Sequence, residues 1–153
     1  MKKVFVLLFA VVALSFASNA QNALGVRFGA GTGTNAELSY QMGLGSNRLE
    51  LDLGWNGAKS DNSFHLAGIY QWNFNIAGDF NWFIGPGAVL GYCPNHGINL
   101  ALAGQIGIEF APSQIPFNFT LDARPSYSFL RPEGCGHNSA FGWGACLGIR
   151  YRF

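Results

Sequence analysis

Apolar and polar residues alternate along most of this chain with a period of two. The clearest example is the stretch 140–153, whose odd positions from Phe141 to Phe153 are apolar or aromatic. Its even positions from Gly142 to Arg152 are glycine, cysteine or arginine. Successive side chains of a strand point to opposite faces, so this pattern predicts a strand with one apolar face and one small or polar face.

The same alternation recurs in seven earlier segments, which are separated by short runs of turn-forming residues. The eight predicted strands cover residues 23–31, 36–44, 48–56, 63–74, 80–92, 98–110, 117–129 and 140–153. Three apolar residues, Ile69, Phe83 and Val89, fall on the otherwise polar face. Pro86 and Pro125 lie inside predicted strands, and because proline cannot donate a ladder hydrogen bond, each predicts a β-bulge.

Composition decides which face of these strands points outward. Charged residues make up 11% of the chain, against about 25% in an ordinary soluble domain. Beyond the N-terminus no apolar run is long enough for a membrane helix. A transmembrane β-barrel reconciles these facts, because its apolar and aromatic residues face lipid and its small and polar residues face the lumen. Eight is an even number, as in bacterial single-chain barrels, and the segment lengths suit a tilted crossing.

The outward aromatic residues gather near the two ends of the predicted strands. If both termini are periplasmic, they form two girdles at the membrane boundaries, as expected for a barrel in lipid. The lower girdle would contain Trp72, Phe74, Phe80, Trp82, Phe110, Phe117, Phe119, Tyr151 and Phe153, and the upper girdle Trp55, Phe64, Tyr92, Tyr127, Phe129, Phe141 and Trp143.

A soluble, lipocalin-like barrel of eight strands is the alternative to a barrel in lipid. It would have to enclose these aromatic residues in an interior just wide enough for one layer of side chains or a small ligand. Its surface would then consist of Gly, Ser and Asn with few charges. The sequence therefore predicts an all-β, eight-stranded, antiparallel up-and-down transmembrane β-barrel.

Residues 1–20 have the features of a cleaved secretory signal peptide. Lys2 and Lys3 form a positive region, an apolar stretch follows over 4–14, and Ser18-Asn19-Ala20 is a small-x-small cleavage site. The alternative is an uncleaved membrane anchor. We expect two parts, a signal peptide over 1–20 and a barrel domain over 21–153. The formal net charge is only +1, so no basic patch suggests a nucleic-acid partner.

The signal peptide, the eight alternating segments and the terminal Tyr151-Arg152-Phe153 resemble small bacterial outer-membrane β-barrels, similar in architecture to the OmpA transmembrane domain and OmpX. The glycine-rich, short-loop style resembles the barrels common in Bacteroidetes. The resemblance implies a location in the outer membrane of a Gram-negative bacterium, contact with its lipid and lipopolysaccharide, and insertion by the barrel-assembly machinery. It also implies an assembly signal in the last strand, at Trp143, Leu147, Ile149, Tyr151 and Phe153.

Charged residues on the inward face are nearly balanced in sign. An unpaired buried charge is costly, so we expect these residues to form ion pairs that close the lumen. The alternative is a narrow path for ions or small solutes, for which the many inward glycines would leave room. The predicted lumen charges are Arg27, Glu37, Glu50, Asp52, Glu109, Asp122, Arg124, Arg150 and Arg152, and His65 belongs to the same polar lining.

Two predicted outer loops on the same side of the membrane carry cysteine and histidine. Cys93 and His96 lie in one of them, and Cys135 and His137 in the other. A Cys93–Cys135 disulfide would suit an oxidising envelope; free thiols or a zinc site are the alternatives, although these spacings are weak zinc signals. Cys146 is left over on the inward face, where it fills space. The sequence indicates no cofactor.

The segment His137-Asn138-Ser139 is similar to the His-x-Ser pair of outer-membrane lipid A deacylases. Such an enzyme needs a carboxylate to orient the histidine, and Glu133 precedes the pair instead of following it. We therefore expect a non-enzymatic outer-membrane protein with a structural or envelope-integrity role. A narrow channel and a lipid A-modifying enzyme are the alternatives. The sequence identifies neither a ligand nor an oligomeric state.

Overall fold

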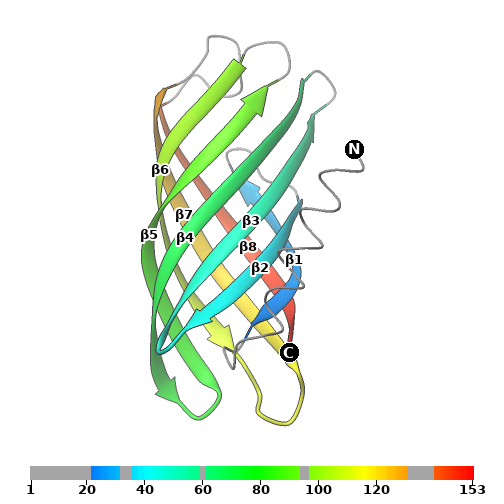
Figure 1. Cartoon of the computed structure of the whole chain (residues 1–153), viewed down its shortest axis with the longest axis vertical. Coiled ribbons are helices and arrows are strands. Elements are labelled where there is room, and N and C mark those ends of the chain that lie inside the picture. Colours follow the sequence, from blue (N-terminus) through cyan, green and yellow to red (C-terminus); the bar gives the residue numbers. More distant parts are fainter. Residues whose placement is uncertain (1–21, 32–35, 59–60, 94–96, 131–139) are drawn as a thin grey trace.

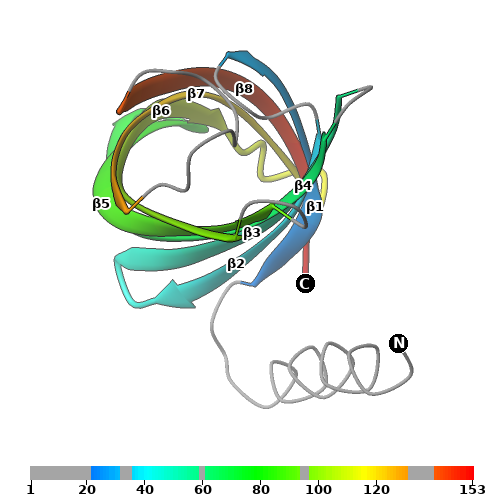
Figure 2. The same ribbon diagram turned by 90° about the horizontal axis from the view of Figure 1, so that it is seen from above.

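The computed structural model describes residues 22–31, 36–58, 61–93, 97–130 and 140–153, and it forms one closed, antiparallel β-barrel. Each strand pairs with the next along the chain, and β1 pairs with β8 to close the ring (Figures 1 and 2). Among the described residues there is no helix long and apolar enough to cross a membrane. The strands are β1 (Ala23–Gly31), β2 (Ala36–Leu44), β3 (Asn47–Ala58), β4 (Asp61–Ala77), β5 (Phe80–Cys93), β6 (Gly97–Phe110), β7 (Phe117–Leu130) and β8 (Phe141–Arg152).

The predicted eight strands are all present, and the first two match their predicted bounds. The largest difference is β4, which extends to Ala77 and leaves only Gly78 and Asp79 between β4 and β5. Gly78 makes this turn possible with a φ of 55°, and Gly45 does the same between β2 and β3 with a φ of 67°. The soluble alternative fails because the apolar faces point out of the barrel. The predicted signal peptide over 1–20 lies outside the described residues.

The two strand prolines do not create bulges, which corrects the sequence prediction. Pro86 pairs in register with Gly104 of β6, and Pro125 pairs in register with Trp143 of β8. Between β4 and β5, and between β6 and β7, two ladder pairs are missing at the proline. The pairs before and after each gap keep the same register. The missing N–H therefore interrupts the ladder without adding a residue. The register shifts instead near Ile76 in β4 and near Phe129 in β7.

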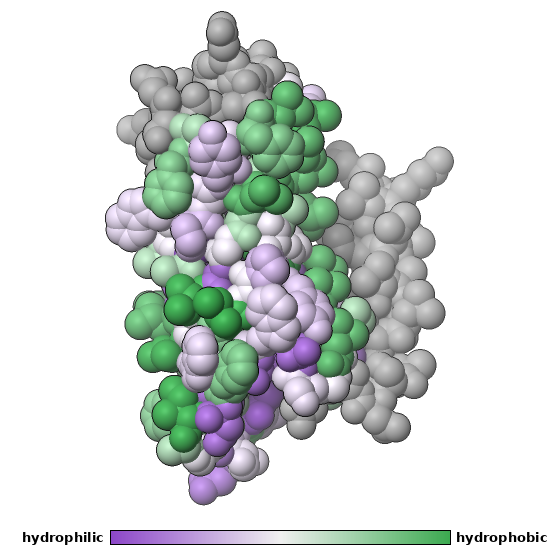
Figure 3. Space-filling view, turned by 90° about the vertical axis from the view of Figure 1, so that its left-hand side faces the viewer, coloured by the Kyte–Doolittle hydropathy of each residue, from purple (hydrophilic) through white to green (hydrophobic). Residues whose placement is uncertain are grey.

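The barrel buries its charges and exposes its apolar side chains. Arg27, Glu50 and Asp52 are completely buried, whereas Trp143 is 60% exposed and Leu147 is 62% exposed. Figure 3 shows hydrophobic side chains over much of one face of the wall. This is the reverse of a soluble protein, in which Asp, Glu and Arg are almost never fully buried. Ile69 and Phe83, two of the apolar exceptions on the inward face, are fully buried in the lumen.

Aromatic side chains lie on the outer surface near both ends of the barrel, as the sequence predicts. Near the end where Arg152 lies, rings on neighbouring strands contact one another: Phe74 stacks on Trp82 and Phe80 packs on Phe110, each pair with ring centroids 4.7 Å apart. Near the other end, Trp55 is paired with Phe64 in register, and Phe64 with Tyr92. We call the end with the β2–β3, β4–β5 and β6–β7 turns the turn end of the barrel.

Candidate functional site

Glu50 on β3 is the centre of the polar network inside the barrel. Its side chain is fully buried, and its position opposite Gln41 of β2 follows from the strand register. Three arginines and three glutamines surround it. The Glu50 carboxylate accepts hydrogen bonds from Gln41 (2.6 Å), Arg150 (2.9 Å), Gln71 (3.1 Å) and Gln105 (3.1 Å), and it lies 3.5 Å from Arg124 Nη2 and 3.7 Å from Arg27 Nη1.

Arg27 and Arg124 link the remaining acidic residues of the central lumen. The Arg27 guanidinium contacts Glu37 and Asp122 and donates to Asp52 over 2.9 Å. Arg124 contacts Asp52 and donates to Glu37 Oε1 over 3.1 Å. These side chains come from strands far apart in sequence, so the ion pairs connect opposite walls of the barrel. Each arginine therefore has more than one carboxylate partner.

A second layer of polar side chains continues the network toward the turn end. Arg48 donates to Gln71 Oε1 and to Glu109 Oε2, each over 2.5 Å. Its guanidinium also lies 4.9 Å from the centre of the Phe83 ring, within the range of a cation–π contact. Asn118 joins this layer by donating to Glu109 over 3.1 Å and to Gln41 over 3.3 Å. The lumen is thus filled at two successive levels.

Several inward glycines do not leave the open space that the sequence suggested for a path. A Cβ on Gly54 would lie 2.0 Å from the His65 ring, and a Cβ on Gly29 would lie 2.4 Å from Cys146 Sγ. Gly107 faces Phe83 in the same way, with 2.6 Å to the ring. In each case the register places the large side chain directly opposite the glycine. These glycines are recesses that a neighbouring side chain fills.

His65 joins the network through its own carboxylate partner. Its Nε2 lies 2.8 Å from Glu37 Oε1, and its side chain is 15% exposed. Glu37 therefore contacts Arg27, Arg124 and His65 together. Breaking a buried ion pair leaves an uncompensated charge and costs about 3–5 kcal/mol. A cluster that shares its carboxylates in this way holds the strands in one register and closes the lumen.

The structure brings together eight of the nine predicted lumen charges. The ninth, Arg152, does not join the lumen network as predicted. Its guanidinium binds the backbone carbonyls of Pro112 and Ile115 at the turn end. Arg48 is the network member that sequence reasoning missed. The signal for it was present: Arg48 has the same parity as Glu50 and Asp52 on one strand, but it falls at the predicted strand end.

Most of the other predicted chemistry lies outside the described residues. This holds for Cys135, His137, Ser139 and the remaining loop residues 94–96 and 131–139, so the predicted Cys93–Cys135 pairing stays a prediction. Cys146 is a free, buried thiol beside Gly29, as expected for a filler. Within the described ranges no group of three or more His, Cys, Asp or Glu side chains could hold a metal ion.

The five residues of the predicted assembly signal lie on the outward face of β8. They belong to the apolar row that runs from Trp143, near the opposite end of β8, to Phe153, which directly follows β8 at the turn end, and each is exposed. The exposed fractions are 60% for Trp143, 62% for Leu147, 47% for Ile149, 48% for Tyr151 and 39% for Phe153. Their role as an assembly signal stays a prediction.

Comparisons with known proteins identify the fold. No protein-family model matches the chain, and no curated protein matches it. Neisserial surface protein A superposes with a TM-score of 0.61 at 13% identity, over 89% of this chain and 98% of that one. The N-terminal β-barrel domain of Pseudomonas aeruginosa OprF gives 0.57 at 16% identity, over 88% and 100%. A de novo designed transmembrane β-barrel gives 0.55 at 18% identity, over 87% and 95%.

These likenesses define a class of protein by its fold. The chain has the eight-stranded β-barrel fold of bacterial outer-membrane proteins, as the sequence predicted. The likeness to a designed barrel is informative as well, because that protein was made to fold in a membrane and shares the same closed sheet. At sequence identities of 13–18%, these comparisons establish the fold alone.

Proposed function

We propose that this protein is a small integral outer-membrane barrel with a structural, envelope-integrity role and a closed lumen. The observation that carries the proposal is the inverted burial: Arg27, Glu50 and Asp52 are inaccessible, while Leu147 and Trp143 are more than half exposed. In water such a surface would aggregate, because exposed apolar patches of this extent are rare in soluble monomers. In lipid it is the expected surface, and the closed ring of strands leaves no unpaired sheet edge.

The start of β1, the end of β8 and the short turns of the turn end would face the periplasm. Three connections gather there, and two of them are only two residues long, as is usual for periplasmic turns. The predicted signal peptide over 1–20 would bring the chain across the inner membrane. The exposed row of β8, from Trp143 to Phe153, would serve the barrel-assembly machinery. Lipopolysaccharide and phospholipid would then surround the wall.

The filled lumen argues against the channel alternative. Eight strands leave an interior just wide enough for side chains, and here the Glu50 cluster occupies it. The arginines that close it each have two or more partners, so no single side-chain movement opens a path. We expect planar-bilayer recordings of the purified protein to show no conductance above background, and steady single-channel steps would contradict a closed lumen.

A heat-modifiability gel tests the proposal most directly. The full chain would be expressed with its N-terminal segment in a Gram-negative host, and its outer membranes would be run boiled and unboiled. A faster-migrating unboiled band in the outer-membrane fraction is expected of a folded barrel that resists detergent. Recovery of the protein in the soluble periplasm, with one mobility under both conditions, would refute membrane integration. Unchanged lipid A profiles on overexpression, for the natural chain and for Ser139→Ala alike, are expected of a non-enzymatic barrel.

A further inference from the structure

Arg152 differs from the other arginines that the structure describes. Arg27, Arg48, Arg124 and Arg150 each form an ion pair with a buried carboxylate. Arg152 forms none with a carboxylate in the described ranges. Its Nη2 donates instead to the carbonyls of Pro112 (2.6 Å) and Ile115 (2.7 Å). Two carbonyls fix the position of the guanidinium, but they do not neutralise its charge.

The remaining donors of Arg152 have no partner in the described part of the chain. Its Nε is buried without a hydrogen bond, and neither hydrogen of Nη1 has a partner there. The nearby carboxylate of Asp79 accepts a hydrogen bond from the Ser113 hydroxyl over 2.9 Å and does not pair with Arg152. An arginine held rigidly with free donors is prepared for an anion with several oxygen acceptors, because its planar fork matches carboxylate and phosphate groups.

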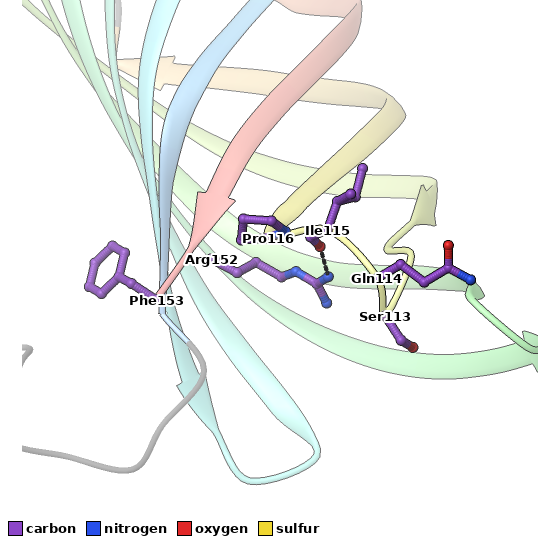
Figure 4. Close-up of a pocket in the computed structure, with 6 residues that line it drawn as sticks. All are labelled: Ser113, Gln114, Ile115, Pro116, Arg152 and Phe153. Carbon is purple, nitrogen blue, oxygen red and sulfur yellow. Dashed lines mark hydrogen bonds between the residues drawn. The ribbon is translucent and has the colours of Figure 1, made fainter.

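An open pocket surrounds this guanidinium at the turn end of the barrel. Ser113, Gln114, Ile115 and Pro116 of the β6–β7 turn line it together with Arg152 and Phe153 of the C-terminal strand (Figure 4). Ser113 and Gln114 give it a polar side, whereas Ile115 is an exposed apolar residue at 42%. Phe153 lies on the other side of the strand from the Arg152 guanidinium, toward the outer wall (Figure 4). The pocket lining therefore combines a fixed positive charge with two apolar residues, Ile115 and Phe153.

We propose that this pocket binds the phosphate group of a phospholipid headgroup in the leaflet at the turn end. Arg152 would hold the phosphate oxygens, and Ser113 and Gln114 would bind the polar headgroup. The glycerol and acyl chains would lie along Ile115 and along Phe153, which follows the outward row of β8. A free phosphate ion would gain polar contacts but none with Ile115 and Phe153, so the lipid is the better occupant. This inference rests on the proposed membrane location, which places a phospholipid leaflet at this height.

Native mass spectrometry of the refolded barrel, released from detergent micelles doped with lipid, tests the proposal. We expect the natural chain to retain one phosphatidylglycerol or phosphatidylethanolamine molecule, and not diacylglycerol, which lacks the phosphate. Arg152→Gln should reduce the retained fraction about fivefold to tenfold, as expected for the loss of one interfacial arginine. Inorganic phosphate should not displace the lipid; if it binds with equal affinity and displaces it, the site takes a free anion and the lipid proposal is wrong.

Two further variants keep the test decisive. Arg152→Gln combined with Ser46→Arg restores the charge on the exposed β2–β3 turn of the same barrel end, and it should not restore retention. Ile115→Asp places a negative charge in the pocket while leaving the Arg152 side chain intact, so it should also release the lipid. It provides the test if Arg152→Gln does not fold. Equal retention in the natural chain and both pocket variants would overturn the inference.

The same preparations separate this inference from the proposed function. Each protein is run boiled and unboiled and is tested for insertion into liposomes. Insertion with a mobility shift but without selective retention would refute only the lipid site. Failure of the natural chain to insert or to shift would refute the membrane barrel and, with it, the lipid site.

Discussion

The inner and outer faces of this barrel are built from alternate residues of the same strands, yet different interactions stabilise them. On β3, Glu50 contacts six polar side chains from other strands, whereas its neighbour Leu51 points to the outer surface. The outer face depends on apolar character, which is non-directional and shared by Leu, Ile, Val and Phe. The inner face depends on partners at fixed distances and angles, for which no other residue substitutes.

This difference teaches where the fold is sensitive to mutation. Outward residues interact with a medium that rearranges around them, so a change of shape has a small effect and only a charge has a large one. Inward residues interact with neighbours that cannot move away, so a change of charge or volume is felt across the lumen. The four predictions below test the two faces, in order of decreasing effect on the free energy of unfolding.

Removing the central carboxylate should have the largest effect. Glu50→Ala removes the carboxylate that Arg27, Arg124 and Arg150 have in common and takes from Arg150 its ion pair. We expect it to lower the free energy of unfolding by about 3–5 kcal/mol. Leu51→Ala, one residue along on the outer face, is the matched control and should cost much less. Urea unfolding in detergent micelles, followed by tryptophan fluorescence, measures both. A larger loss for Leu51→Ala would contradict the importance of the Glu50 network.

A charge on the outer wall should have a depth-dependent effect. Leu147 lies in the middle of β8, so Leu147→Arg should cost about 2–4 kcal/mol in lipid. Tyr151→Arg near the turn end should cost about 0–1 kcal/mol, because the arginine reaches the interface there. Unfolding from liposomes of the two variants gives the difference. Equal effects at both positions, or none, would show that this face is not in contact with a hydrocarbon core.

Filling an inward recess should destabilise the barrel where filling an outward one does not. Gly54→Ala forces its Cβ against the His65 ring and should cost about 1–3 kcal/mol, the usual range for overpacking. Gly104→Ala is the control, because the nearest atom to its Cβ is 3.8 Å away, in ordinary contact. Truncating the ring in a Gly54→Ala, His65→Ala double variant should recover part of the loss. A double-mutant cycle without coupling would show that the two positions do not meet.

Changing one aromatic pair of the turn-end girdle should have the smallest effect. Phe74 stacks on Trp82 with an interplanar angle of 22°, and Phe74→Leu should remove about 0.5–1.5 kcal/mol of ring–ring attraction. Phe64→Leu near the opposite end removes a ring of similar exposure that makes no ring contact with a described residue. In the same urea titration, Phe74→Leu should be the more destabilising of the two variants. The reverse order would show that the Phe74–Trp82 contact does not stabilise the barrel.

The sequence alone determined the number of strands, their approximate bounds and which residues point inward. These properties are local, because the alternation of side chains between two faces depends only on backbone geometry and composition. The parity placed Arg27, Glu37, Glu50 and Asp52 inside, and it identified Ile69 and Phe83 as inward apolar residues. The same pattern, together with the low fraction of charged residues, predicted a barrel in a membrane, because so few charges cannot cover the surface of a soluble protein.

Only the tertiary structure decided which inward residues meet. Glu50 finds Arg150 and Arg124 because closure of the ring and the stagger of its strands bring distant walls together, and no local pattern encodes this. The same register places His65 opposite Gly54, pairs Arg48 with Glu109, and carries Arg152 past the lumen to the carbonyls of the β6–β7 turn. The prolines follow the same principle: their effect on the ladder depends on the partner strand, which the sequence of one strand does not contain.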